Sequence, residues 1–342
     1  MFASVARAVR LSVDAPDIQK AFVCDVSTPL MVSWVLYMMD DAQKRGIRRL
    51  YFCARDVHTP YLVARRLKPL YPDVEARYLF ISMQAMRSEE VLCEYLKQEG
   101  VLSKESVALV DSNSSGNTMI RINAMANRRH LKAVHGYYLT GWNPSVKLIP
   151  TPEDLENIQY LNFPLYAGAV SVSAVKRLSG MRILFELVLS LNYHQRTVGY
   201  ERHGTCMRPV LETDTEDKWW LDGADVRQAK RNNDAMALAF AHALVTTGLH
   251  HYPKELLSQI AVPMLVEFVD RPNRKYLRYL HQFVWQGKPL VGPLLGKEKG
   301  VWHRGSVFYQ LPCFLSAPLR GILSNLKLRR QLNHLWVWKS RK

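Results

Sequence analysis

Residues 107–118 read Val107-Ala-Leu-Val-Asp-Ser-Asn-Ser-Ser-Gly-Asn-Thr118 and combine a strand pattern, a polar loop and the start of a helix. Four consecutive apolar residues, 107–110, predict a short buried strand that ends on the carboxylate of Asp111. The polar loop 112–117 follows, and apolar residues recur at helical spacing from Thr118 onward. The stretch therefore predicts a strand–loop–helix unit with polar side chains where the strand ends.

A polar loop in front of a helix is suited to binding an anion. The amides of the first helical turn have no partner within the helix, and the helix dipole favours negative charge. Gly116 lets the backbone approach a ligand closely. Asp111 has the wrong charge for a phosphate, so we expect it to bind sugar hydroxyls or a metal ion. The stretch predicts a site for a phosphorylated sugar; the alternative is an ordinary strand–turn–helix, because Ser, Asn and Thr are also common capping residues.

Composition limits the class of protein. The chain has 342 residues, enough for two domains, and its apolar fraction of 48% excludes disorder as the main state. The two longest apolar runs, 29–39 and 235–245, fall short of the roughly 20 residues that span a bilayer and predict buried helices. The five cysteines are scattered and odd in number, without a C-x-x-C pair. This pattern indicates a reducing compartment, so we expect a soluble cytoplasmic protein.

The net charge of +16 predicts polyanionic partners. Nucleic acid, a phosphorylated substrate and the acidic surface of a membrane all satisfy this requirement. Composition does not choose among the three.

Strand and helix patterns alternate on both sides of residues 107–118. Residues 1–20 predict an irregular lead-in, and Thr28 before Pro29 predicts the N-cap of a helix. Four strands are then expected at 50–54, 77–81, 107–110 and 133–140, with a helix in each interval. This alternation predicts an α/β fold, in which a doubly wound, mainly parallel, Rossmann-like sheet is covered by helices on both faces.

Polar residues follow three of these predicted strands. Arg55 and Asp56 follow the first strand, Ser82 the second, and Asp111 with its loop the third. Ligands of parallel sheets gather at the carboxyl ends of the strands. We therefore expect all three groups to face one crevice.

The second half of the chain is less regular. The proline-rich joint 143–152 predicts a boundary between an α/β domain at 1–150 and a mostly helical domain at 151–342. The last 24 residues, 319–342, contain seven Lys or Arg residues, no acidic residue, and two tryptophans. They predict either a helix that binds an anionic membrane surface or a helix packed on its own domain.

The motifs at the strand ends resemble those of a known family. Residues 107–118 resemble the signature of purine-salvage phosphoribosyltransferases, with Val110 in place of the first of two acidic residues. More specifically, residues 29–142 resemble the phosphoribosyltransferase-like glycosyltransferase domains of bacterial O-antigen and capsule biosynthesis, often described as haloacid-dehalogenase-like. The motifs are Arg49-Leu-Tyr-Phe-Cys-Ala-Arg-Asp56, Tyr78-Leu-Phe-Ile-Ser82-Met-Gln-Ala85 and Val110-Asp-Ser-Asn-Ser-Ser-Gly116.

The resemblance implies transfer of a 5-phosphoribosyl unit from phosphoribosyl diphosphate to a sugar hydroxyl on a lipid-linked glycan. It implies that Asp111 holds the ribose hydroxyls, that Arg55 and Mg²⁺ act on the diphosphate, and that Asp56 binds the metal or accepts the acceptor proton. The substrate-binding residues it implies are Ser112, Ser114, Ser115, Gly116, Asn117, Thr118 and Ser82. A separate haloacid-dehalogenase-type phosphatase would remove the 5-phosphate.

Two departures from the family pattern bear on activity. Val57 replaces the glycine after Arg-Asp, and Met83 replaces the arginine after Ser82. The alternatives are a non-catalytic nucleic-acid-binding or assembly protein on this fold, and a nucleobase phosphoribosyltransferase. The basic residues are spread along the chain without a recognisable nucleic-acid-reading module, which disfavours nucleic acid as the partner.

Overall fold

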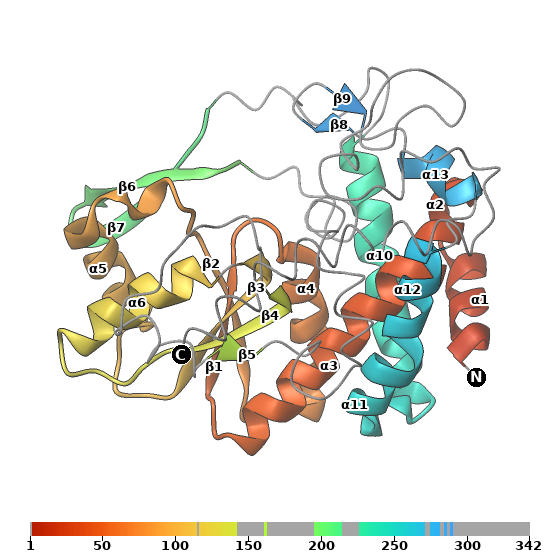
Figure 1. The fold of residues 1–342 in the computed structure, drawn as a ribbon, viewed down its shortest axis with the longest axis horizontal. Helices are drawn as coiled ribbons and strands as arrows, with labels where there is room; N and C mark the ends of the chain where they lie inside the picture. Colours follow the sequence, from red (N-terminus) through yellow and green to blue (C-terminus); the bar gives the residue numbers. More distant parts are fainter. Residues whose placement is uncertain are drawn as a thin grey trace, which may run out of the picture.

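The computed structural model of the protein describes residues 2–114, 116–141, 161–162, 195–213, 226–270, 274–280, 284–285 and 288–289. Within these residues a five-stranded parallel sheet has the order β2-β1-β3-β4-β5 (Figure 1). Its strands are β1 (Arg49–Cys53), β2 (Glu75–Leu79), β3 (Val107–Ser114), β4 (His135–Gly141) and β5 (Leu161–Asn162). The predicted α/β class with a parallel sheet is confirmed.

Helices occupy the predicted intervals between the first four strands. They are α4 (His58–Leu67), α5 (Glu89–Gln98) and α6 (Asn117–Asn127), and α3 (Thr28–Lys44) precedes β1. Short 3-10 turns at Lys68–Leu70 and Ala85–Arg87 follow α4 and β2. The alternation of strand and helix that the sequence predicts is therefore present element by element.

Alternate residues of the strands enter two different apolar cores. In β1, Leu50 and Phe52 join the core beneath α3 and α4, while Tyr51 and Cys53 join the core beneath α5 and α6. Successive strand side chains point to opposite faces, so a strand that is apolar throughout needs a cover on both sides. Figure 1 shows this arrangement, with α3 and α4 on one side of the sheet and α5 and α6 on the other.

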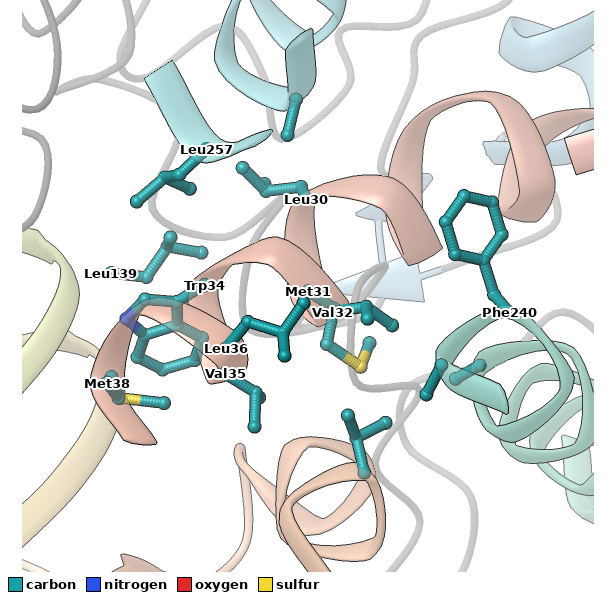
Figure 2. Close-up of a cluster of buried hydrophobic side chains, with 14 of the residues drawn as sticks. Leu30, Met31, Val32, Trp34, Val35, Leu36, Met38, Leu139, Phe240 and Leu257 are labelled. Atoms are coloured by element: carbon teal, nitrogen blue, oxygen red, sulfur yellow. The ribbon is translucent and has the colours of Figure 1, made fainter. Parts of the chain in front are cut away.

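Helix α3 is buried on nearly every side. Figure 2 shows its side chains between Leu139 of β4 and Phe240 and Leu257 from later in the chain. The helix continues backwards through a π-helical turn, Val23–Ser27, into α2 (Asp17–Phe22). Thr28 has helical backbone angles inside this run, so the predicted N-cap is wrong. The π turn lies just before Pro29, which lacks an amide donor and crowds the preceding turn.

The run Asp17–Lys44 is long and apolar enough to cross a membrane by length and composition. However, 89% of its most apolar window is buried inside the protein, as expected for a core helix. The sequence pattern underestimated the length of this helical run, because the π turn joins α2 and α3, which look like separate segments in the sequence. The buried-helix interpretation of residues 29–39 is confirmed.

The two ends of the described chain pack together on the α3 and α4 side. α1 (Phe2–Ser12) contacts α10 (Val226–Thr246), α10 contacts α3 and α4, and α13 (Arg274–Leu280) contacts α2. The shorter α11 (Pro253–Glu255), the π turn Leu256–Ala261 and α12 (Val262–Asp270) complete this layer. The irregular lead-in predicted at residues 1–20 is wrong, since two helices form there. The boundary at residue 150 stays a prediction.

An antiparallel hairpin of β6 (Thr197–His203) and β7 (Cys206–Leu211) covers the α5 side. Tyr200 stacks on Tyr95 at 4.3 Å between ring centroids, and its hydroxyl donates to the carbonyl of Phe80 over 2.9 Å. The hairpin is thereby fixed to the carboxyl end of β2. A small pair, β8 (Val284–Trp285) and β9 (Lys288–Pro289), lies further along the chain.

Candidate functional site

The strand order defines a switch point at the carboxyl ends of β1 and β3. The chain passes from β1 to β2 on one side of β1, and then forms β3 on the other side. Connections that diverge in this way leave a crevice outside the carboxyl ends, and ligands of open α/β sheets bind there. Two of the three predicted polar groups flank this switch point, Arg55 and Asp56 after β1 and Asp111 in β3.

The carboxylates of Asp56 and Asp111 both act on the thiol of Cys53. This thiol is the last residue of β1, and it is buried. Burial raises its pKa well above the ordinary value, and the carboxylates of Asp111 and Asp56 raise it further. Both carboxylates therefore lie in the neighbourhood of the carboxyl end of β1. Cys53 would remain a neutral thiol there, so it is suited to packing rather than to nucleophilic attack.

Arg55 and Asp56 are neighbours with partial access to solvent. The Arg55 Nε to Asp56 Oδ1 distance is 4.0 Å, and their side chains are 22% and 29% exposed. The peptide bond between Ala54 and Arg55 is cis. An ion pair at this separation is weak, since exposed pairs stabilise by only about 0–1 kcal/mol. This ion pair by itself therefore adds little to the stability of the fold.

The loop between β3 and α6 is shorter than the sequence suggested. β3 runs through Ser114 instead of ending near Val110, and α6 begins at Asn117 rather than Thr118. Gly116 is the N-cap, with a φ of 83°, and its carbonyl accepts the first helical hydrogen bond from Ile120 at 2.9 Å. The left-handed backbone favours glycine at this position. The expected strand–glycine–helix junction is present, in a tighter form.

Strand geometry separates Asp111 from Ser112. Asp111 continues the row of Leu109, which faces α5 and α6, whereas Ser112 continues the row of Val110, which faces α3 and α4. Ser112 is 3% exposed, and its hydroxyl has no hydrogen-bond partner within the described part of the chain. The sequence treated the two residues as members of one loop, because it did not predict that the strand continues past Val110.

Ser114 and Ser115 are two further residues that were predicted to bind the substrate. Ser115 lies outside the described residues, and Ser114 is described only as the last strand residue. Asn117 and Thr118 occupy the first turn of α6, where backbone amides lack helical partners. Their roles as substrate ligands stay predictions.

Ser82 is held by protein groups rather than presented to a ligand. Its hydroxyl donates to the carbonyl of Thr197 over 2.5 Å and accepts from the amide of Ala85 over 3.1 Å. Met83 follows Ser82, and its sulfur lies 3.9 Å from Thr118 Oγ1. This contact joins the segment after β2 to the start of α6.

The two carboxylates match one requirement of a magnesium ion. No group of three or more His, Cys, Asp or Glu side chains able to hold a metal occurs among the described residues. Mg²⁺ typically binds through one or two carboxylates together with substrate phosphates. Asp56 and Asp111 fit a metal that arrives with a phosphorylated ligand, and they do not form a complete protein site.

Sequence reasoning missed a buried polar cluster beneath α4. Lys230 of α10 is 1% exposed, and its Nζ donates to Thr59 Oγ1 at 2.6 Å and to the carboxylate of Asp234. Thr59 is the second residue of α4, three residues after Asp56. The polar run 230–234 inside an otherwise apolar helix was the available signal. The cluster anchors α10 to the start of α4.

These features define an α/β protein with polar side chains at the switch point of its parallel sheet. A comparison with models of known protein families finds no match, and no curated protein matches the chain.

Proposed function

We propose that the protein is a glycosyltransferase that moves a 5-phosphoribosyl unit from phosphoribosyl diphosphate to a sugar hydroxyl of a lipid-linked surface polysaccharide. The observation that supports this most is the strand order. A basic–acidic pair follows β1, and the neighbouring β3 contains a carboxylate and leads into a helix N-terminus, so these groups flank one switch point. A phosphoribosyltransferase-like fold is part of the same proposal.

The chemistry of the transfer matches these groups. Breaking the anomeric C–O bond produces an oxocarbenium-like centre on the ribose and a diphosphate leaving group. Positioning of the ribose and stabilisation of the leaving charge then dominate catalysis. Asp111 accepts hydrogen bonds from the ribose hydroxyls, and the amides at the start of α6 bind the 5-phosphate.

The loop after β1 acts on the other end of the donor. The guanidinium of Arg55 binds the diphosphate, and Asp56 holds the metal or accepts the proton of the acceptor hydroxyl. Mg²⁺, when bound with the donor, adds positive charge to the leaving group. Val57 and Met83 change this pocket relative to the resembled family, so the rate with a given acceptor is a property to be measured.

The acceptor determines where the protein would work. A lipid-linked glycan would keep it at the cytoplasmic face of the inner membrane, and a separate phosphatase would remove the 5-phosphate. The basic segment 319–342, proposed to bind the anionic surface, lies outside the described residues. Sedimentation with vesicles should show binding that needs anionic lipid and falls with salt, and deletion of this segment should abolish it. Loss of folding on deletion would instead assign the segment to the core.

The donor assignment is tested first by calorimetry. Phosphoribosyl diphosphate with Mg²⁺ should bind the wild-type protein, and ribose 5-phosphate should bind more weakly because it lacks the diphosphate. In the presence of a lipid-linked or synthetic glycan, diphosphate should be released. A wild-type protein that binds neither phosphoribosyl diphosphate nor inorganic diphosphate would contradict the proposal.

A further inference from the structure

Tyr78 of β2 lies next to the loop that follows β1. It pairs in register with Phe52 of β1, and its ring meets that of His58, the first residue of α4, at 5.4 Å in an edge-to-face arrangement. Tyr61 also lies against it, with ring centroids 5.4 Å apart. These aromatic contacts fix the ring on the α3 and α4 side of the sheet.

The hydroxyl of Tyr78 is buried and has no hydrogen-bond partner within the described residues. Other buried tyrosines of the sheet differ. Tyr51 donates to the carbonyl of Glu99 over 2.6 Å, and Tyr137 donates to the carboxylate of Asp41 over 2.6 Å. A buried hydroxyl without a partner destabilises the folded state, so such a group calls for an explanation.

The surroundings of Tyr78 indicate what its hydroxyl could bind. Burial raises the pKa of Tyr78, the carboxylate of Asp56 raises it further, and Arg55 opposes these effects. The phenol is therefore neutral. Asp56 is two residues before His58, whose ring contacts that of Tyr78, and the Tyr78 hydroxyl makes no hydrogen bond to its carboxylate in this structure. Arg55, which lies 4.0 Å from Asp56, is also the nearest candidate to bind a diphosphate.

We infer that Tyr78 is a positioning residue that donates a hydrogen bond to Asp56 when the donor substrate binds. The inference rests on the proposed function. Arg55 turns from Asp56 toward the diphosphate, and the Tyr78 hydroxyl then becomes a hydrogen-bond partner of the Asp56 carboxylate. The exchange orients Asp56 without requiring the ligand to reach the buried phenol.

The variant Tyr78→Phe tests this inference because it removes only the hydroxyl. Its melting temperature without ligand should equal or exceed that of the wild type, since no bond is lost. Its affinity for phosphoribosyl diphosphate with Mg²⁺ should fall about tenfold or more, the effect of losing a hydrogen bond to a charged group. Tyr51→Phe is the matched control, and it should melt lower with unchanged affinity.

A double-mutant cycle with Asp56→Asn separates the positioning role from direct contact. If Tyr78 acts through the Asp56 carboxylate, the tenfold loss should shrink strongly in the Asp56→Asn background. A loss of the same size in both backgrounds would show contact with the donor itself and would overturn the inference. A lower melting temperature for Tyr78→Phe would also overturn it, because the hydroxyl would then have a structural partner.

The same titrations distinguish the inference from the proposed function. If the wild type binds phosphoribosyl diphosphate and Tyr78→Phe binds it equally well, the inference fails and the function stands. If the wild type binds only inorganic diphosphate, and Tyr78→Phe binds it less tightly, the inference holds for the anion and the donor assignment fails. If the wild type binds neither compound, both are overturned.

Discussion

Charged residues are arranged differently at the amino ends of the parallel strands, here called the amino edge of the sheet, and at their carboxyl ends, here called the carboxyl edge. At the amino edge Arg49 forms ion pairs with Glu75 at 3.3 Å and Glu105 at 2.7 Å, and Arg77 bonds Glu75 at 2.9 Å. The hydrogen bond from Arg77 lowers the pKa of Glu75. These charges stabilise one another, so this edge presents a compact ionic network.

The carboxyl edge combines charged residues with buried hydroxyl groups. Arg55 Nε and Asp56 Oδ1 are 4.0 Å apart. The carboxylates of Asp56 and Asp111 both raise the pKa of the buried thiol of Cys53. Within the described residues, the buried hydroxyls of Tyr78 and Ser112 have no partner.

A cavity at the amino edge is a rival location for a ligand. An open cavity of about 780 Å³ lies at the amino edge, with Arg48, Lys68 and Lys132 among its lining residues. Lys68 is already bonded there to the carbonyls of Pro72 and Val74. Among the described residues, buried polar atoms without a partner occur at both edges, including His135 Nε2 at the amino edge. We give the carboxyl edge more weight, because the switch point of the strand order lies there.

The largest effect is expected for Asp111→Asn at the carboxyl edge. Orientation of the ribose matters most in the transition state, so the rate of diphosphate release should fall about 100-fold or more while donor affinity changes less. The measurement is diphosphate release under saturating donor, with calorimetry for affinity. Equal rates for mutant and wild type would remove Asp111 from the site.

A second comparison exchanges one arginine at each edge. Arg55→Met should weaken binding of Mg²⁺-diphosphate by about tenfold or more, since a charge-assisted hydrogen bond is lost. Arg48→Met, which alters the amino-edge cavity, should leave this affinity unchanged. Calorimetric titration of both variants measures the difference. The reverse ranking would assign the anion site to the amino edge.

The pH dependence of stability tests the amino edge separately. Burial, assisted by nearby Arg45, lowers the pKa of His135 at the start of β4 from 6.5 to about 4. The unfolded chain therefore binds this proton at a higher pH than the folded protein does. His135 should lower the free energy of unfolding by about 2–3 kcal/mol as the pH falls from 7 to 4.5.

Urea unfolding at several pH values measures the effect of His135. Replacement by Gln should flatten this part of the profile, because Gln does not titrate. If the free energy of unfolding of the variant depends on pH as steeply as that of the wild type, other groups are responsible for the pH dependence.

The smallest effect is expected for Glu105→Gln in the ionic network. Both partners are partly exposed, so loss of the pair with Arg49 should cost about 0.2–1 kcal/mol. Donor binding and transfer should not change. Thermal unfolding at low and high salt measures the cost, which should shrink as salt increases. A loss of activity would mean that the two edges are coupled.

Local sequence pattern predicted much of the sheet and little of what surrounds it. The succession of β1 to β4 and their helices along the chain followed from apolar runs and helical spacing, which are set by neighbouring residues. The helices at residues 2–22 were missed, since their burial depends on α10 and α13, more than 200 residues away in the chain. The extension of β3 to Ser114 was missed because pairing with Thr140 and Gly141 of β4 outweighs the turn preference of Ser and Asn.

The sequence by itself determined the α/β class and the residue types at the strand ends, because strand and helix periods and the glycine before α6 are local properties. The tertiary structure alone decided which of those residues meet. Strand order put β1 beside β3, the pleat sent Asp111 and Ser112 to opposite faces, and the hairpin engaged Ser82. Tyr78 and Lys230 gained their significance only from burial, since a polar group is costly where the fold has removed water from it.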